Sequence, residues 1–563
     1  MTKTTAGGAI FPRLKALGVE HVFVNSGTDF PPIIEGLAQA AEAGLEMPAA
    51  LTIGHEHVAM GMAHGAWLAT GRLQAVMLHT NVGLANGAIG AINAAVDQVP
   101  ILMMSGRTPT LEAGRFGART VPIGWGQEMR DQTALVREAS KWDYELRFPE
   151  QIEDALDRAA AIAQSTPSGP VYLSLPREAL CEEVELRADP APVMTPTAAR
   201  APEAAVEAAA DLLAAAERPL IVAQRGCGDE AGWAALDRLA RDWAIPVSDY
   251  WALENAVSQA HPAYVGADVG PWVAEADAAL VIDSLAPWSP EMHAPSPAMR
   301  VVQLGPDPLM ARTPIRNFRA DVALATETGP GLVALEAAMK RRRSDGEALI
   351  AARRERVEAA ARAAQAANRA IGEIAPGQPM TKGFVAARIG ALIADEDATV
   401  LSELGVPLAP LGLTRPKQWR QEPHAGGLGW SFPCAMGMKL AAPERTVIAS
   451  MGDGSYMFAN PVACHQAAEA YGIAPLIVIV NNAGWGAVRQ SVAGLYPEGA
   501  ATRANRTPLT DLSPSPDFAA IARASRAWAE RVERAEDLDA ALAAALAETK
   551  AGRLALLDVA VAD

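Results

Sequence analysis

Two short polar segments in the last third of the chain have the residue types of a phosphate and metal site. Gly452-Asp453-Gly454-Ser455 follows the apolar run Thr446–Met451, and Asn481-Asn482-Ala483-Gly484 follows the apolar run Pro475–Val480. The stretch Pro461–Tyr471 between them is expected to be a helix, so the two apolar runs should be strands of one parallel sheet that end at the same edge. A carboxylate, an amide oxygen and a backbone carbonyl then converge, and such hard oxygen ligands suit Mg²⁺ or Ca²⁺.

The glycines of the first segment leave room for a phosphate group. Gly452 and Gly454 allow the backbone to approach a diphosphate closely. Together the two segments resemble the thiamin diphosphate motif, in which GDG is followed by NN. The resemblance implies a diphosphate site formed by Gly452, Gly454, Ser455 and Asn482, and a Mg²⁺ ion bound by Asp453, Asn482 and the carbonyl of Gly484. An ordinary strand, turn and helix is the alternative, which the joint occurrence of both segments disfavours.

The rest of the chain supplies the elements that must position these residues. Apolar runs alternate with helical segments in three successive stretches, which predicts three doubly wound α/β domains with parallel sheets. We expect an N-terminal pyrimidine-binding domain at 1–187, a central Rossmann-like domain at 203–340 and a C-terminal diphosphate-binding domain at 375–563. The proline-rich stretch Pro190–Pro202 is predicted to be a linker, and 340–374 a largely solvated connecting helix or two.

Composition excludes several function classes. The chain has 563 residues and a formal net charge of −17, which argues against nucleic acid and anionic membrane surfaces as partners. Its four cysteines are far apart and form no metal-ligand pairs, as in a reducing compartment. No signal peptide and no membrane span is visible. We therefore expect a cytoplasmic enzyme.

A glutamate near the N-terminus is the candidate for activating the cofactor. Glu56 stands in Gly54–Gly65, just after the apolar run Leu51–Ile53 and at the expected start of a helix. This stretch resembles the glutamate motif of the thiamin-dependent 2-oxo-acid decarboxylase and acetolactate synthase superfamily. The resemblance implies that Glu56 holds N1′ of the aminopyrimidine, which makes the 4′-imino group basic enough to take the C2 proton. The alternative is a glutamate that only supports its own helix start.

Two further loops resemble motifs of the same superfamily. Asn25–Asp29 resembles the G-x-P-G loop of the superfamily, with Ser26 in place of the usual proline. His424–Trp430 resembles the motif that binds the aminopyrimidine. There the resemblance assigns the carbonyl of Gly426 as acceptor for the 4′-amino group, and the side chain of Leu428 as the wedge between the two cofactor rings. A plain core leucine is the alternative for Leu428.

The type of reaction rests on fewer residues. His79 lies 23 residues after Glu56, at the end of an apolar run. Benzoylformate decarboxylase carries an active-site histidine at this place, and Thr28 falls on its active-site serine. The resemblance therefore adds His79 and Thr28 to the catalytic residues, with His79 protonating or orienting an intermediate. A strand-end histidine satisfied by the backbone is the alternative.

Other features point in a different direction. Gln127 resembles the glutamine in the F-Q-E motif of acetolactate synthases, and Val488-Arg489-Gln490 is also similar to that family. His55 and His57 flank Glu56 and are expected to be structural. The loop Gln224–Gly228 follows the first apolar run of the central domain; in this superfamily such a loop occurs with and without bound FAD or ADP. FAD therefore stays open as a cofactor, although the sequence disfavours it.

These features together predict a lyase or carboligase that depends on thiamin diphosphate and Mg²⁺ and acts on a 2-oxo acid or an aldehyde. The resemblance implies non-oxidative decarboxylation through an enamine intermediate, with carboligation to an aldehyde or ketone as a second outcome, and benzoylformate decarboxylase as the nearest kind. Three alternatives remain: an acetolactate synthase-type acyl transferase, a flavin-containing oxidase, and a non-catalytic nucleotide-binding paralogue. The resemblance to the superfamily also implies a homodimer or homotetramer with active sites between subunits.

Overall fold

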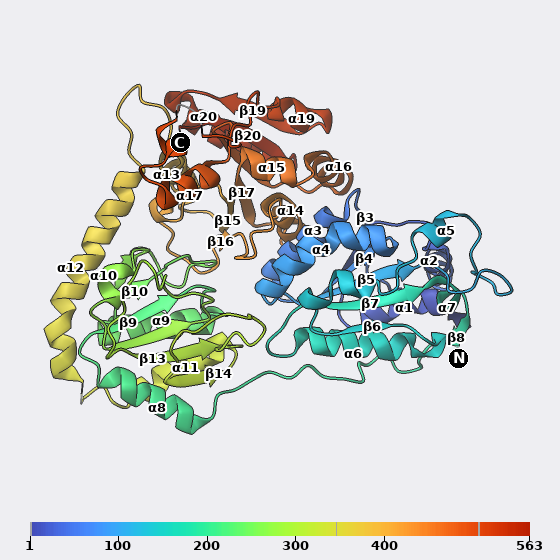
Figure 1. The fold of residues 1–563 in the computed structure, drawn as a ribbon, viewed down its shortest axis with the longest axis horizontal. Coiled ribbons are helices and arrows are strands. Elements are labelled where there is room, and N and C mark those ends of the chain that lie inside the picture. Colours follow the sequence, from blue (N-terminus) through green and yellow to red (C-terminus); the bar gives the residue numbers. More distant parts are fainter. Residues whose placement is uncertain (1–2, 345, 505–506, 563) are drawn as a thin grey trace. The chain divides into compact units, whose positions relative to one another are not determined.

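A computed structural model describes residues 3–344, 346–504 and 507–562. The described residues form three six-stranded sheets and a separate two-stranded ribbon of β1 (Lys3–Thr5) and β8 (Glu183–Glu185). Figure 1 shows the sheets with the helices that cover them. Three α/β domains with parallel sheets are thereby confirmed. Within the described residues no helix is both long enough and apolar enough to cross a membrane.

The sheet of the first domain has the order β3-β2-β4-β5-β7-β6, and its strands pair in parallel. Helices α1, α2 and α6 lie on one face, and α3 and α4 lie on the other. The central strands are buried on both faces, which is why they are continuous apolar runs. The elements are β2 (His21–Val24), β3 (Ala49–Thr52), β4 (Gln74–Leu78), β5 (Ile101–Arg107), β6 (Asp143–Glu145), β7 (Val171–Pro176), α1 (Ala6–Ala16), α2 (Pro31–Glu42), α3 (Glu56–Thr70), α4 (Thr80–Val96), α5 (Ile123–Gly126), α6 (Ile152–Gln164) and α7 (Arg177–Leu180).

The central domain contains a second parallel sheet, with the order β11-β10-β9-β12-β13-β14. Helices α8, α9 and α11 pack together, and the apolar residues of this sheet and of these helices form one buried cluster. The elements are β9 (Pro219–Ala223), β10 (Val247–Ser248), β11 (Tyr264–Gly266), β12 (Ala278–Ile282), β13 (Arg300–Gly305), β14 (Val322–Ala325), α8 (Glu203–Ala214), α9 (Glu230–Trp243), α10 (Gly270–Val273) and α11 (Thr328–Lys340). The predicted connecting segment forms the long helix α12 (Glu347–Ile371).

The third sheet consists of β15 to β20. Strands β17 and β18 pair in parallel, with Gly452 opposite Val480, so the two predicted turns do follow neighbouring strand ends. The predicted helix Pro461–Tyr471 is observed as α16 with the same bounds. The elements are α13 (Lys382–Leu392), β15 (Ala398–Glu403), β16 (Trp419–Gln421), α14 (Ser431–Ala441), β17 (Thr446–Gly452), α15 (Asp453–Phe458), α16, β18 (Leu476–Asn481), α17 (Gly486–Leu495), α18 (Ala500–Arg503), α19 (Phe518–Ala524), β19 (Trp528–Val532), α20 (Leu538–Lys550) and β20 (Ala555–Ala560).

By its contacts the chain divides into two compact units. One contains Met1–Thr197, Glu422–Arg531 and Ala544–Val559; the other contains Ala198–Gln421, Val532–Ala543 and Ala560–Asp563. In the first unit, α3 packs closely against α14. This crossing depends on residues without side chains, because a Cβ on Gly65 would lie 1.8 Å from the carbonyl oxygen of Cys434, and one on Gly437 would lie 1.8 Å from that of Met62.

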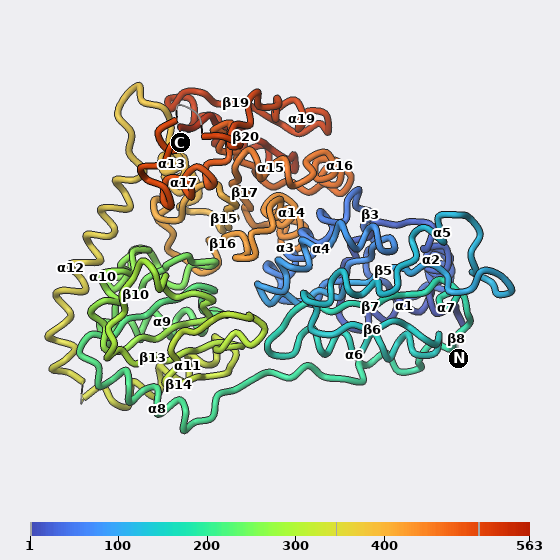
Figure 2. The backbone as a smooth tube through the Cα atoms, in the orientation of Figure 1, coloured from blue at the N-terminus to red at the C-terminus, as the bar shows by residue number. Residues whose placement is uncertain are grey.

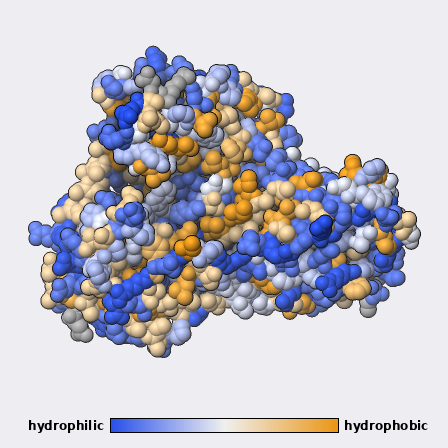
Figure 3. Space-filling model, viewed as in Figure 1, coloured by the Kyte–Doolittle hydropathy of each residue, from blue (hydrophilic) through white to orange (hydrophobic). Residues whose placement is uncertain are grey.

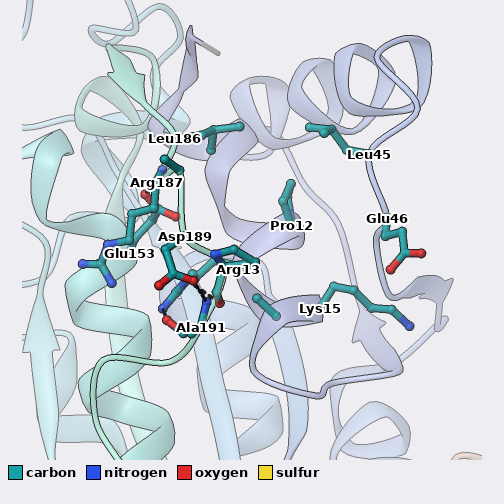
Figure 4. Close-up of a pocket in the computed structure, with 13 residues that line it drawn as sticks. Pro12, Arg13, Lys15, Leu45, Glu46, Glu153, Leu186, Arg187, Asp189 and Ala191 are labelled. Carbon is teal, nitrogen blue, oxygen red and sulfur yellow. Dashed lines mark hydrogen bonds between the residues drawn. The ribbon is translucent and has the colours of Figure 1, made fainter. Parts of the chain in front are cut away.

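The first part of the predicted linker is a strap fixed to the first domain (Figure 2). The buried Arg13 is paired with Asp157 at 2.5 Å and also donates to the carbonyls of Pro190 and Ala191. Farther on, the amide of Thr197 donates to the Ser165 hydroxyl. Figure 4 shows Arg13 beside the strap, in a pocket of about 660 Å³. Composition predicted a linker here, and hydrogen bonds hold its first part in place as far as Thr197.

Candidate active site

The diphosphate motif is built on the adjacent ends of β17 and β18. Asp453 begins the short helix α15 and is buried, with 2% of its surface exposed. The side chain of Asn481 is used within the fold: its amide donates to Asp558, and its oxygen accepts from the backbone amide of Ala483. Asn481 therefore shapes the turn, and Asn482 stands at the tip of the turn. The carbonyl of Gly484 accepts from the amide of Gly486.

The donor set of this turn fits a hydrated cation that also holds phosphate. Ser455 is buried, and its hydroxyl has no hydrogen-bond partner within the described residues, so it can serve a ligand oxygen. One carboxylate with an amide and a carbonyl is typical of Mg²⁺, which keeps waters and phosphate oxygens as its other ligands. In the described residues no three His, Cys, Asp or Glu side chains gather as a metal site, but this site requires only one. Gly454 has a further role, because a Cβ there would lie 2.1 Å from the Trp485 ring.

Glu56 is the first residue of α3, and His55 caps the helix by accepting from the amide of His57. The Glu56 side chain is buried, and its Oε2 accepts a 3.0 Å hydrogen bond from Asn86 of α4. Gly83 leaves the space for the carboxylate, since a Cβ there would lie 2.8 Å from Oε1. The carboxylate is thus fixed by its neighbours, in contrast to a glutamate that only supports a helix start.

The predicted aminopyrimidine loop is held by two residues that sequence reasoning did not assign to it. Asn93 and Gly427 exchange two hydrogen bonds, of 2.9 Å from the Asn93 amide and 3.2 Å to its oxygen. His57 lies 3.1 Å from the carbonyl of Gly429, and burial lowers the pKa of its imidazole. A neutral His57 therefore donates from Nε2. Both contacts bring the loop to helices α3 and α4, the helices that carry Glu56 and Asn86. Gly426 is exposed, with a φ of +67° and open space where a Cβ would stand, and Leu428 is half-buried.

His79 follows β4 and meets Asp29, which follows β2. These strands are neighbours at the point where the chain order of the sheet reverses, the usual place for a ligand in an open α/β sheet. The His79 Nδ1 lies 2.5 Å from Asp29 Oδ1, and the amide of Thr80 donates to Oδ2. The hydrogen bond to Asp29 raises the pKa of His79; burial opposes this shift, and the charges of Asp29 and Glu56 support it.

Thr28, the other predicted catalytic residue, is exposed, and its carbonyl accepts from Arg177. Among the described residues the hydrogen bonds of the His79 ring are made by Asp29 and Gln127. From the sequence, Asp29 was recognised only as the last residue of the loop Asn25–Asp29, with no role of its own. The signal that could have found it was an acidic residue in the loop after the first strand of a doubly wound domain.

Three domain models match along the chain. They are the N-terminal TPP binding domain of thiamine pyrophosphate enzymes at residues 4–135, the central domain of these enzymes at 206–335, and their C-terminal TPP binding domain at 407–559. The protein belongs to the thiamin diphosphate-dependent decarboxylase and acetolactate synthase superfamily. Its recognition from the two polar segments and the glutamate motif is thereby confirmed.

Relatives within this superfamily catalyse different reactions. The chain is 28% identical to the "Probable 2-ketoarginine decarboxylase AruI" of Pseudomonas aeruginosa, over 95% of this chain and 90% of that protein. It is 27% identical to the benzoylformate decarboxylase of the same organism, over 99% and 98%. Acetolactate synthase large subunits are among the further relatives. The fold is similar to that of a 4-hydroxybenzoylformate decarboxylase from Rhodococcus jostii, with a TM-score of 0.78, 21% identity and 99% of each chain covered.

The glycine loop of the central domain, Gln224–Gly228, lies among acidic side chains, whereas a diphosphate site needs free amide groups or cations. Arg225 lies 3.1 Å from Asp283, which follows β12, and a Cβ on Gly226 would lie 2.6 Å from the carboxyl carbon of Glu254. Asp229 already caps α9, accepting a 2.7 Å hydrogen bond from the amide of Gly232. Of the three carboxylates at the loop, Asp283 and Glu254 are paired with Arg225 and Arg420, and Asp229 occupies the helix N-terminus. This disfavours the diphosphate of FAD or ADP.

Proposed function

We propose that this thiamin diphosphate-dependent enzyme is a Mg²⁺-dependent lyase that decarboxylates a 2-oxo acid without oxidation, and that it can join the product to an aldehyde or ketone. The observation that carries the proposal is the Asp29–His79 pair at the switch point of the sheet that also carries Glu56. The pair adds a titratable group to the cofactor machinery, at the edge of the sheet where a substrate would bind.

The cofactor would be held by the residues of both turns. Asp453, Asn482 and the Gly484 carbonyl would bind Mg²⁺, with Gly452, Gly454 and Ser455 around the diphosphate; Glu56, the Gly426 carbonyl and Leu428 would take the aminopyrimidine. When bound, the cofactor supplies an electron sink for the charge left on the substrate carbon as CO₂ departs.

The protein's own contribution is proton control. Glu56 would hold a proton against the pyrimidine nitrogen, and its 3.0 Å bond from Asn86 keeps the carboxyl in place. His79 would exchange a proton with the substrate through Nε2, because Nδ1 is committed to Asp29. The central domain would act without FAD, since its loop is surrounded by Asp229, Glu254 and Asp283.

The substrate is best found with a small panel of 2-oxo acids. The panel should contain 2-ketoarginine, benzoylformate, 4-hydroxybenzoylformate and pyruvate, assayed for CO₂ and for product with thiamin diphosphate and Mg²⁺ added. We expect CO₂ release and the corresponding aldehyde from at least one. Acetolactate from pyruvate would instead support the acyl transferase alternative. The resemblance of Gln127 to the glutamine in the F-Q-E motif of acetolactate synthases favours that alternative. Consumption of O₂ would support an oxidase, and silence on every member would support a non-catalytic paralogue.

We also propose a homodimer, or a tetramer of two such dimers, with each site shared between subunits. The two halves of the site lie on separate domains joined through residues 198–421, so either the same copy or a second copy can provide the second half. Helix α4 has an apolar face that a second copy would cover, formed by Val82, Ile89 and Ile92, each 43–49% exposed. It contributes to the hydrophobic area near the middle of Figure 3. Asn86, the partner of Glu56, lies on this same exposed face.

Subunit exchange tests the shared site. Mixing inactive Glu56→Gln with inactive Asp453→Ala should restore part of the activity, because one site in each mixed dimer then has both intact halves. A mass-labelled copy confirms that exchange has occurred. No recovery after confirmed exchange would mean that each chain completes its own site, as the packing of α3 on α14 within one chain would allow.

A further inference from the structure

A glutamine on the loop after β5 closes the free side of the His79 ring. The Nε2 of Gln127 lies 3.3 Å from the Nε2 of His79. The amide can donate only to an unprotonated ring nitrogen. With Nδ1 donating to Asp29 and the Gln127 amide donating to Nε2, the ring would be the neutral tautomer with its proton on Nδ1. A protonated Nε2 would instead need the Gln127 oxygen, and so a rotation of the amide.

The carboxylate behind the ring is held in place from several sides. Asp29 is 4% exposed and uses one oxygen for His79 and the other for the amide of Thr80. A Cβ on Gly27 would lie 2.1 Å from the His79 ring, and one on Gly106 would lie 1.7 Å from Asp29. The ring and the carboxylate are therefore close-packed against two glycines, and neither can move toward its glycine without moving backbone.

The backbone beside the ring is strained. Thr80 is buried and has a φ of +43°, a conformation that β-branched residues rarely adopt and that costs about 1–3 kcal/mol. The hydrogen bond from its amide to Asp29 holds it there. Strain of this kind persists where the surroundings fix one geometry, and here the fixed geometry is the direction of the His79 ring.

Gln127 is also anchored, although its loop is largely exposed. The next residue, Glu128, accepts from Arg107 at 2.6 Å, from Arg119 at 2.7 Å and from the Thr108 hydroxyl. Charge-assisted bonds in a network fix a side chain better than one surface pair does. The Glu128 anchor therefore keeps the Gln127 amide over the ring.

We propose that Asp29 and Gln127 are positioning residues for His79: Asp29 fixes the ring with Nε2 toward the substrate, and Gln127 gates that nitrogen by turning its amide when the ring gains or loses a proton. The proposal rests on the proposed function, because it concerns a proton passed to the substrate after CO₂ has left. In that step the Nε2–H bond breaks, a bond from the proton to the substrate carbon forms, and the electron pair stays on the ring nitrogen. Solvent then returns a proton to Nε2.

The sign of the pH dependence follows from the charges around the ring. Asp29 and Glu56 both favour the protonated ring, and burial opposes it. Arg177 is the cation on the Asp29 loop, bound to the carbonyl of Thr28. Since the pKa of His79 is raised in the folded protein, the stability it contributes is present at low pH. That stability is lost as pH rises through the raised value.

The experiment is an NMR titration of the apoprotein with labelled histidine, which needs no substrate. The variants are Asp29→Asn, Gln127→Leu and Ile123→Ala, the last an exposed control on the same loop; His79→Gln assigns the signal. We expect a wild-type pKa above about 6.5 and a fall of about one unit or more in Asp29→Asn. Gln127→Leu should weaken the preference for the Nδ1–H tautomer, and Ile123→Ala should match the wild type.

A second measurement uses the pH profile of kcat once a substrate is known. Gln127→Leu should lower kcat by about tenfold or more and move the alkaline limb, with KM changed much less. Equal His79 pKa values in the wild type and Asp29→Asn would overturn the role of Asp29. A tautomer and pH profile in Gln127→Leu that match those of Ile123→Ala would overturn the gate. The titration is independent of turnover. It therefore tests the roles of Asp29 and Gln127 even if no 2-oxo acid is decarboxylated.

Discussion

The first and central sheets each carry a charged pair at the point where their strand order reverses. In the first sheet Asp29 and His79 follow β2 and β4; in the central sheet Arg225 and Asp283 follow β9 and β12. Both edges contain a non-glycine residue with positive φ, Thr80 at +43° and Asp283 at +39°. The two edges therefore have the same topology, a pair of similar geometry and similar backbone strain.

The two pairs differ in what the cation can do. A guanidinium does not give up its proton in proteins, whereas an imidazole changes charge near neutral pH and has a second nitrogen. His79 presents that nitrogen to Gln127. On the central edge, Gln224 donates to the carbonyls of Tyr250 and Ala286, so this amide is used within the fold. Topology thus creates the same edge twice, and one side chain decides whether it can move protons or only hold the fold.

The largest expected effect is on the activation of the cofactor, which should depend on the first domain and not on the charged pair of the central domain. Glu56→Gln should slow hydrogen–deuterium exchange at thiamin C2 by about 10²- to 10⁴-fold, because an amide is a far weaker acid toward the pyrimidine nitrogen. Quenched-flow NMR measures the rate. The matched control is the double variant Arg225→Leu/Asp283→Asn, which removes both charges of the central pair and should exchange like the wild type. An equal slowing in both would erase the distinction between the edges.

The central pair should be visible in stability instead. The side chains of Arg225 and Asp283 are 10% and 8% exposed, so Arg225→Leu removes a paired cation from a buried carboxylate. We expect the central domain to lose about 3–5 kcal/mol of unfolding free energy in Arg225→Leu, and much less in the double variant with Asp283→Asn. Urea unfolding followed by tryptophan fluorescence checks this. A single variant as stable as the double one would show that the pair is not structural.

The metal site gives the next effect. Asp453→Ala should weaken thiamin diphosphate binding in the presence of Mg²⁺ by at least about 100-fold, or about 2.7 kcal/mol, because the cation that neutralises the diphosphate loses its carboxylate. Titration calorimetry measures the affinity. Asp229→Ala on the central glycine loop is the control: it should cost about 1 kcal/mol of stability through the lost helix cap and leave the affinity unchanged. The opposite pattern would place the diphosphate in the central domain.

The smallest effect concerns the loop that meets α4. Asn93→Ala removes two neutral hydrogen bonds to Gly427 and should weaken cofactor binding by about 30-fold, since each such bond contributes about 1 kcal/mol. The same calorimetry measures it. Gln132→Leu is a matched loss of a buried amide in the first domain, where Gln132 donates to Ser105 and to the Gly106 carbonyl. Similar losses of affinity in both would reduce the role of Asn93 to general packing.

The buried strands of each sheet could be predicted from sequence, and several outer strands could not. Runs such as 446–451 are mostly apolar because both faces of a central parallel strand are covered. The outer strand β6 has the sequence Asp-Tyr-Glu, so it gives no apolar run. Strand β10 has only two residues. These strands are specified by their neighbours in the sheet.

The residues of the candidate site also divide into those that the sequence could suggest and those that it could not. Glu56, Asp453 and Asn482 could be proposed from the sequence because they belong to contiguous motifs. Asp29, Gln127 and Asn93 act through partners 50, 48 and 334 residues away, and no local pattern records such a contact. Thr28 was chosen by position, whereas the geometry brings its neighbour Asp29 to His79. Fold and cofactor are thus readable from local sequence, but the partners that orient the side chains emerge only from packing.

The most direct test of the account is CO₂ release by three proteins under one set of conditions. The wild type, Glu56→Gln and the double variant Arg225→Leu/Asp283→Asn would be assayed with the 2-oxo-acid panel, thiamin diphosphate and Mg²⁺. We predict CO₂ from the wild type and from the double variant at comparable kcat, and a loss of about 10²-fold or more in Glu56→Gln. Equal CO₂ release from the wild type and Glu56→Gln, or none from the wild type on any 2-oxo acid, would contradict the account.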